Sequence, residues 1–176
     1  TGRLYRYDYA TGKMSAFTAG DNSTPFGYKD IILLDSGKLL CSSLDGIITI
    51  DPATGEVRES SLGSSKEVSA AMTDSKGNIW LALYNNGIEV YDQQENLIYS
   101  YNTSNSALNN NVVLCFTERD GRIWAGTNGG GINIIDPEEG RITALSHVSG
   151  NPASFPAQSI KSIYTDTYGN IWAGSM

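Results

Sequence analysis

Carboxylates recur in this sequence at a fixed distance from a glycine and a tryptophan, and this spacing is the first place to look for chemistry. Asp74, Glu118 and Asp166 each stand three residues before a glycine and six before a tryptophan. The glycines are Gly77, Gly121 and Gly169, and the tryptophans are Trp80, Trp124 and Trp172. Ca²⁺ needs about six to eight oxygen ligands around one point, and each of these segments offers a single carboxylate. We therefore expect no metal site, and expect the carboxylates to end a strand and accept hydrogen bonds from turn amides.

Residue types that carry out catalysis are scarce. The single histidine, His147, is expected on an outer strand, and neither G-x-S-x-G nor H-E-x-x-H occurs. Glu67, Glu89 and Glu118 are expected on different strands, with no pairing among them. The glycine-rich segment 128–131 lacks the lysine and the helix of a phosphate-binding loop. We expect no catalytic residue and no cofactor.

The carboxylate, glycine and tryptophan belong to a phrase that the chain repeats. The copies are D-S-K-G-N-I-W-L-A at 74–82, E-R-D-G-R-I-W-A-G at 118–126 and D-T-Y-G-N-I-W-A-G at 166–174, with a weaker copy, L-D-S-G-K-L-L-C-S, at 34–42. Their glycines are separated by 40, 44 and 48 residues. A period in the forties is typical of one four-stranded propeller blade.

Each unit divides into four short strands, A to D, rich in β-branched and aromatic residues and separated by Gly, Asn, Asp and Pro. No stretch has a sustained helical period. The sequence therefore predicts an all-β fold, an incomplete β-propeller of about four blade equivalents. Strands C and D of a first blade are predicted at 1–25, whole blades at 26–63, 64–104 and 105–150, and strands A and B of a last blade at 151–176. In the third whole blade the strands are expected at 112–117, 123–126, 131–135 and 142–146.

The repeated residues have physical roles in such a blade. The glycine supplies the positive φ that a tight turn between strands A and B needs. The tryptophan on strand B would pack between neighbouring sheets and bury about 150–250 Å². Leu40 at that position in the weakest copy agrees with plain packing, although a sugar-stacking role for the tryptophans stays open. Cys41 and Cys115 fall in different blades, so we expect free thiols.

One face of the predicted propeller carries the variable loops, those from D to the next A and from B to C. They are expected at 19–28, 63–66, 102–111 and 149–158, and at 43–45, 84–86 and 128–130. Amides and phenols gather there, and such groups suit uncharged, hydroxyl-rich ligands. The candidate binding residues are Tyr28, Tyr84, Asn85, Asn86, Asn110, Asn111, Asn128 and Gln158. Because asparagine is also a good turn former, a purely structural role stays open. The face with the A–B turns is expected to be scaffold.

The net charge and the short apolar runs exclude some classes of binding partner. The 176 residues carry a net charge of −7, with a pI near 4.6, which argues against binding to nucleic acid or to anionic membrane surfaces. The longest apolar runs are far too short to cross a membrane, so we expect no direct membrane contact in this segment.

The phrases quoted above, together with D-G-R-I-W-A-G-T-N-G-G-G-I-N-I-I-D-P at 120–137, closely resemble the two-component regulator propeller repeat. The resemblance covers nearly the whole chain and is weakest around Leu40. It implies the periplasmic sensor region of a hybrid two-component histidine kinase from a Bacteroides-type bacterium. Such regions sense oligosaccharides and control genes for polysaccharide use. The kinase parts of that family are not in this sequence, and its repeat motif places no ligand-contacting residue.

Two other functions stay open. A propeller enzyme of the sialidase or streptogramin-lyase type would need an arginine cluster with a tyrosine nucleophile, or several convergent histidines. The arginines here are expected on turns and outer strands, and one histidine is available. A propeller that binds proteins and no small ligand is the third reading.

The incomplete first and last blades predict self-association. Strands A and B at 160–175 of one copy could pair with strands C and D at 3–17 of another, and two copies would then close an eight-blade ring. If the chain is a sensor segment, a lone copy is expected to bind sugar weakly or not at all, because the site would need blades that this sequence does not contain. Light scattering coupled to size exclusion should show a discrete dimer at micromolar concentration, and a monomer would contradict the pairing.

Overall fold

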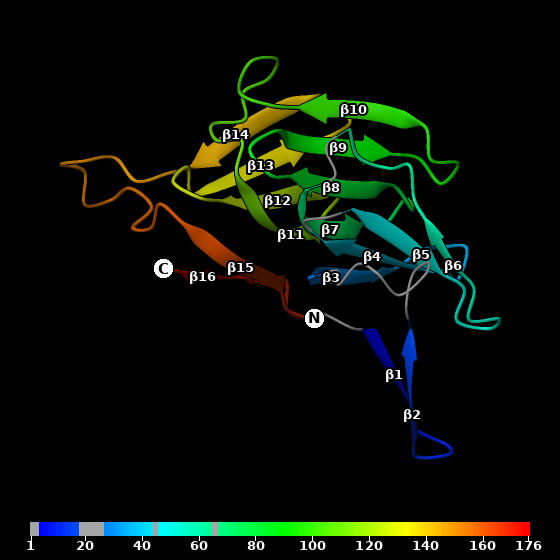
Figure 1. Cartoon of the computed structure of the whole chain (residues 1–176). Helices are drawn as coiled ribbons and strands as arrows, with labels where there is room; N and C mark the ends of the chain where they lie inside the picture. Colours follow the sequence, from blue (N-terminus) through cyan, green and yellow to red (C-terminus); the bar gives the residue numbers. More distant parts are fainter. Residues whose placement is uncertain (1–3, 18–26, 44–45, 65–66) are drawn as a thin grey trace.

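The computed structural model describes residues 4–17, 27–43, 46–64 and 67–176. All regular structure in these residues is β, in sixteen strands that pair antiparallel within five sheets (Figure 1). The predicted all-β class is therefore confirmed. No helix long and apolar enough to cross a membrane occurs in these ranges. Parts of three predicted loops, 19–26, 44–45 and 65–66, lie outside the described residues.

Three of the sheets are four-stranded blades whose strands lie side by side in chain order. The first blade contains β3 (Tyr28–Leu33), β4 (Leu39–Ser43), β5 (Ile47–Ile50) and β6 (Val57–Glu59). The second contains β7 (Val68–Thr73), β8 (Ile79–Leu83), β9 (Gly87–Tyr91) and β10 (Leu97–Tyr101). The third contains β11 (Val113–Arg119), β12 (Arg122–Thr127), β13 (Ile132–Asp136) and β14 (Arg141–Leu145).

Two shorter sheets lie beyond these blades. The first hairpin pairs β1 (Leu4–Asp8) with β2 (Lys13–Phe17), and the last hairpin pairs β15 (Ile160–Thr165) with β16 (Ile171–Ser175). No sheet closes on itself within the described residues, in agreement with an incomplete propeller. The first strands of successive sheets, β3, β7, β11 and β15, are neighbours, and β10 and β14 lie on the outer rim (Figure 1).

The blades are buried on both faces because neighbouring sheets pack against each other. All five residues of β8 are buried. Trp80 and Ala82 belong to the core shared with the third blade, whereas Leu81 and Leu83 belong to the core shared with the first. Successive side chains on a strand point to opposite faces, so this one strand contributes to both cores.

The repeated tryptophans lie in three different environments. Trp80 is fully buried, with its ring stacked on Tyr101 at a centroid distance of 6.1 Å and edge-on to Phe116 at 6.5 Å. Trp124 is partly buried. Trp172 is 63% exposed, so the expected packing between sheets does not occur there. The reason is that no described sheet covers that face of the last hairpin.

A carboxylate clamp builds two of the A–B turns. Asp74 accepts hydrogen bonds from the backbone N–H of Lys76 (3.0 Å) and of Asn78 (2.8 Å), from the Asn78 side-chain amide (2.9 Å) and from the Trp80 indole (2.9 Å). Asp166 accepts the same four kinds of bond from the turn that leads to Trp172. The indole of Trp172, followed by the Asn170 side chain, lowers the pKa of Asp166 to about 2.

Glu118 does not have this role, which corrects the expectation from the repeated phrase. It lies inside β11 opposite Ile123, and its carboxylate accepts a hydrogen bond of 2.6 Å from the backbone N–H of Ser75 in the second blade. The turn itself consists of Asp120 and Gly121, with φ of 52° and 71°. Two successive residues with positive φ form the tight hairpin that Asp-Gly favours, so the strand continues past Glu118.

Two further expectations concern the histidine and the cysteines. His147 is not on an outer strand, because β14 ends at Leu145, and its side chain is exposed. Cys41 on β4 and Cys115 on β11 are free thiols, and burial raises the pKa of each to about 11.

We predict unequal costs for removing the first and last of these tryptophans. Trp80→Ala should lower the free energy of unfolding by about 3–5 kcal/mol, because it empties a fully buried site between blades. Trp172→Ala, the matched control, should cost less than about 1.5 kcal/mol, since its ring is mostly in water and it loses one exposed hydrogen bond. Urea unfolding followed by circular dichroism measures both; equal costs would contradict the packing described.

We predict that the clamp at Asp166 opens only in strong acid. Its pKa in the folded protein is about 2, below the ordinary value of 3.8, so its stabilising contribution is complete above pH 3.8 and is lost as the pH falls towards 2. The indole N–H resonance of Trp172 should titrate with a midpoint near 2. In Asp166→Asn this titration should vanish. A midpoint at the ordinary carboxyl value would show that the clamp does not form in solution.

Candidate functional site

The loops that follow β10 and β14 leave the blades at the same end (Figure 1). The same end of the blades carries the turns between their second and third strands, around 84–86 and 128–130. Backbone hydrogen bonds connect these turns to the loop that follows β10. The Gly87 N–H donates to the carbonyl of Asn111 at 3.0 Å, and the Asn128 N–H donates to the carbonyl of Val112 at 2.9 Å. This is the face on which the sequence predicted ligand binding.

The structure brings five of the predicted residues into one continuous line, the amide row: Asn86, Asn110, Asn111, Asn128 and Gln158. Asn86 precedes Gly87, whose N–H donates to the backbone carbonyl of Asn111. The side-chain amide of Asn110 donates to the carbonyl of Asn128 at 2.8 Å. The carbonyl of Gln158 accepts from the N–H groups of Gly129 (3.0 Å) and Gly131 (2.7 Å). The row thus crosses from the second blade to the third and on to the last hairpin.

Much of the hydrogen-bonding capacity of the amide row holds the loops in shape. The side-chain oxygen of Asn110 accepts from the Val112 N–H at 2.8 Å, and that of Asn111 accepts from the Thr103 N–H at 2.8 Å. The side-chain oxygen of Asn128 accepts from the Ser159 hydroxyl at 2.9 Å. The structural role that asparagine can have in turns therefore accounts for these three side chains in large part.

Two groups that face outward lie at the tip of the 84–86 turn. Tyr84 is 49% exposed. Asn85 is exposed with φ of 57°, and its side chain makes no hydrogen bond to the described residues. Gln158 is exposed as well, and its side chain makes no hydrogen bond to the described residues. Tyr84, Asn85 and Gln158 are thus the predicted residues best able to meet a ligand. Tyr28, in contrast, packs beside Cys41 and Ile48 away from the row, and burial raises its pKa.

Two buried polar groups lie beneath this face: Asn133, which sequence reasoning missed, and Glu89, which it considered only as a catalytic carboxylate. Asn133 is fully buried in β13 and exchanges hydrogen bonds of 2.8 and 3.1 Å with Asn109. Its signal was a polar residue among the apolar residues of I-N-I-I at 132–135. Glu89 is also buried; its carboxylate accepts from the Tyr91 hydroxyl at 2.5 Å and from the Ser64 N–H at 2.9 Å. Burial raises the pKa of Tyr91 to about 12, so its hydroxyl stays a donor.

These groups suit recognition better than catalysis. In the described ranges, no three histidine, cysteine, aspartate or glutamate side chains gather as metal ligands would. Glu89 is already held by two donors under the loop that follows β6. Outward amide and phenol groups can donate to and accept from hydroxyl groups, which is the chemistry of binding a neutral polar molecule.

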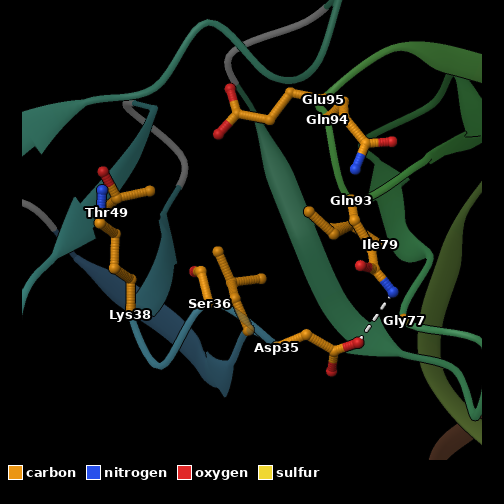
Figure 2. A pocket seen from close by; sticks show the side chains of 10 residues that line it. Asp35, Ser36, Lys38, Thr49, Gly77, Ile79, Gln93, Gln94 and Glu95 are labelled. Atoms are coloured by element: carbon orange, nitrogen blue, oxygen red, sulfur yellow. Dashed lines mark hydrogen bonds between the residues drawn. The ribbon is translucent and has the colours of Figure 1, made fainter.

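The opposite face, expected to be scaffold, contains a cleft of about 410 Å³ between the first and second blades. Figure 2 shows Lys38 and Thr49 on one side, Gln93, Gln94 and Glu95 on the other, and Asp35 between them. The Gln93 side-chain amide donates to Asp35 at 2.9 Å and to the carbonyl of Lys76 at 3.1 Å. Gly77 lies directly beneath, where a Cβ would collide with the side chains of Gln93 and Asp35. Two blades therefore meet closely at the base of the cleft.

Comparison with known proteins identifies the repeat. The family model of the two component regulator propeller matches residues 107–129 and 154–176. Two segments of the chain resemble two-component regulator propeller repeats. Both matched segments begin in a loop of the amide-row face and run through strands A and B, β11–β12 and β15–β16. No curated protein matches the chain.

Solved structures confirm the propeller fold of these regulator repeats. An extracellular domain assigned to a hybrid two-component system of B. thetaiotaomicron aligns with a TM-score of 0.79 at 19% identity, over 99% of this chain and 24% of that one. Virginiamycin B lyase from Staphylococcus aureus aligns with a TM-score of 0.73 at 18% identity, over 99% of this chain and 56% of the lyase. The WD40 propeller domain of Doa1 aligns with a TM-score of 0.64 at 18% identity, over 91% of this chain and 50% of that one.

Proposed function

We propose that this chain is a ligand-sensing propeller segment on the extracytoplasmic side of a hybrid two-component sensor histidine kinase. The observation that carries the proposal is the pair of regulator propeller repeats at 107–129 and 154–176. Similarity in fold to an extracellular domain assigned to such a system supports the placement outside the cytoplasm, in the periplasm of a Bacteroides-type cell. The chain spans about a quarter of that domain's length.

The ligand that best suits the amide-row face is an oligosaccharide released from a polysaccharide. The exposed side chains at the tip of that face, Tyr84 and Asn85, are uncharged, and each can bind hydroxyl groups. A sensor of this kind would control genes for polysaccharide use. The ligand can change kinase output only by binding one arrangement of the propeller and its neighbouring domains more tightly than another.

A lyase-type activity has less support, although a lyase shares the fold. That likeness, at 18% identity, concerns the fold alone. The one histidine of the sequence, His147, is exposed on a loop beyond the outer strand β14. We therefore assign this segment a binding role and no catalytic step.

The full-length sensor gives the direct test of ligand and face. A transcriptional reporter of kinase output should respond to one oligosaccharide among tetrasaccharides of glucose, xylose, arabinose and mannose. Asn85→Ala should raise the concentration for half-maximal response by about tenfold, the loss expected for one good hydrogen-bonding contact. Thr143→Ala on the outer strand β14 is the control and should leave the response unchanged. If Asn85→Ala responds like the wild-type sensor to every sugar that activates it, the ligand does not bind at this face.

A further inference from the structure

The cleft between the first and second blades differs from the corresponding place between the second and third. There, Lys76 in the A–B turn of the second blade reaches the C–D turn of the third blade, and its Nζ lies 2.6 Å from Oε1 of Glu138. This ion pair links the second and third blades at the end of the sheets where the cleft opens between the first and second blades. The same two turns therefore face each other at both junctions between blades, but an ion pair spans only the junction of the second and third blades.

The residues at the matching positions of the first junction explain why it is open. Lys76 precedes the turn glycine Gly77, and the residue before Gly37 in the first blade is Ser36. Glu138 stands two residues after Asp136, and the residue two after Asp92 in the second blade is Gln94. A serine hydroxyl cannot span the distance that a lysine side chain covers, so Ser36 and Gln94 line the cleft without closing it.

Three charged groups of the cleft have no ion pair within the described residues: Lys38, Asp35 and Glu95. No opposite charge lies within 4.0 Å of any of them, and the only interaction of Lys38 with a carboxylate among the described residues is a longer-range attraction to Asp51. Lys38 projects from the first blade and Glu95 from the second, on opposite walls (Figure 2). One oxygen of Asp35 accepts from Gln93, and its other oxygen has no hydrogen-bond partner among the described residues. The cleft therefore offers separated positive and negative charge.

The remaining lining is partly apolar. Leu34 and Ile79, one from each blade, contribute aliphatic surface between the charged walls. A volume of about 410 Å³ is at the small end of the range for ligand sites, which suits a molecule of amino-acid size. The close contact of Gly77 with Gln93 and Asp35 fixes the two walls relative to each other at the base. Such a preformed cleft limits the ordering cost of binding.

We propose that this cleft is a second binding site, separate from the amide-row face, for a small zwitterion with an aliphatic body. The ligand's ammonium group meets Glu95, its carboxylate meets Lys38, and its aliphatic part lies towards Leu34 and Ile79. A neutral sugar would leave Lys38 and Glu95 without an opposite charge, so this site selects a different chemical class from the amide row. The inference does not depend on the sensor function proposed above.

The test is a titration of the 176-residue chain followed by the amide resonances of Thr49, Gly77 and Ile79. L-leucine is the probe. Leucinamide lacks the carboxylate and 4-methylpentanoate lacks the ammonium group. Leucine should give saturable shifts, and each comparator should bind at least about tenfold more weakly because it loses one charged contact. Equal binding of leucine and either comparator would overturn the zwitterion assignment.

Variants locate the site. The double substitution S36K with Q94E rebuilds the ion pair of the second junction across the first and should abolish leucine binding. Ser104→Lys adds the same positive charge on the distant loop face and should leave binding unchanged. Lys38→Gln and Glu95→Gln, which remove exposed charges with little effect on folding, should each weaken binding by about tenfold. Leucine shifts that persist in the double variant, or the absence of saturable shifts in the wild-type chain, would refute the proposal.

Discussion

Both faces of the blades are apolar, and this constraint determines how the whole chain is arranged. In β8 alternate side chains enter two separate cores, with Trp80 facing the third blade and Leu81 facing the first. A sheet of this kind cannot bury both faces alone, so it needs a neighbour on each side. The radial order of the sheets, with first strands adjacent and loops collected at two ends, follows from that need.

The sequence predicted the sheets well because each blade repeats the same local signals. Turn residues and apolar strands recur in a period that fits four strands, and the sheets form where those signals lie. The prediction failed at Glu118 because aligning the repeated phrases assumes that each copy has the same strand register. Asp120 and Gly121 form a two-residue turn in which both residues have positive φ, and this choice moves the register by one residue. Only pairing across the hairpin reveals it.

The two candidate sites were predictable to different degrees. Asparagines in loops of one face could be expected to meet, since propeller topology brings those loops together, and Asn110 and Asn128 do meet. Which of their atoms remain open to a ligand depends on hydrogen bonds that sequence spacing does not contain. The cleft on the other face exists because Ser36, which is short and uncharged, cannot form an ion pair between the first and second blades. The pair Lys76 and Glu138 shows that comparing turn positions between blades could have found it.

The three tryptophans are buried to different degrees, so their fluorescence can report on the surroundings of the last sheet. Trp80 is sealed between blades, Trp124 is partly covered, and Trp172 is 63% exposed on the last sheet. An indole in water emits at longer wavelength than one in a dry core, and it is reached more easily by an ionic quencher such as iodide. Anything that comes to cover the last sheet, whether another blade or another protein, would therefore shift the emission of Trp172 towards the blue. Attachment at that end of the propeller can be followed by fluorescence without a label.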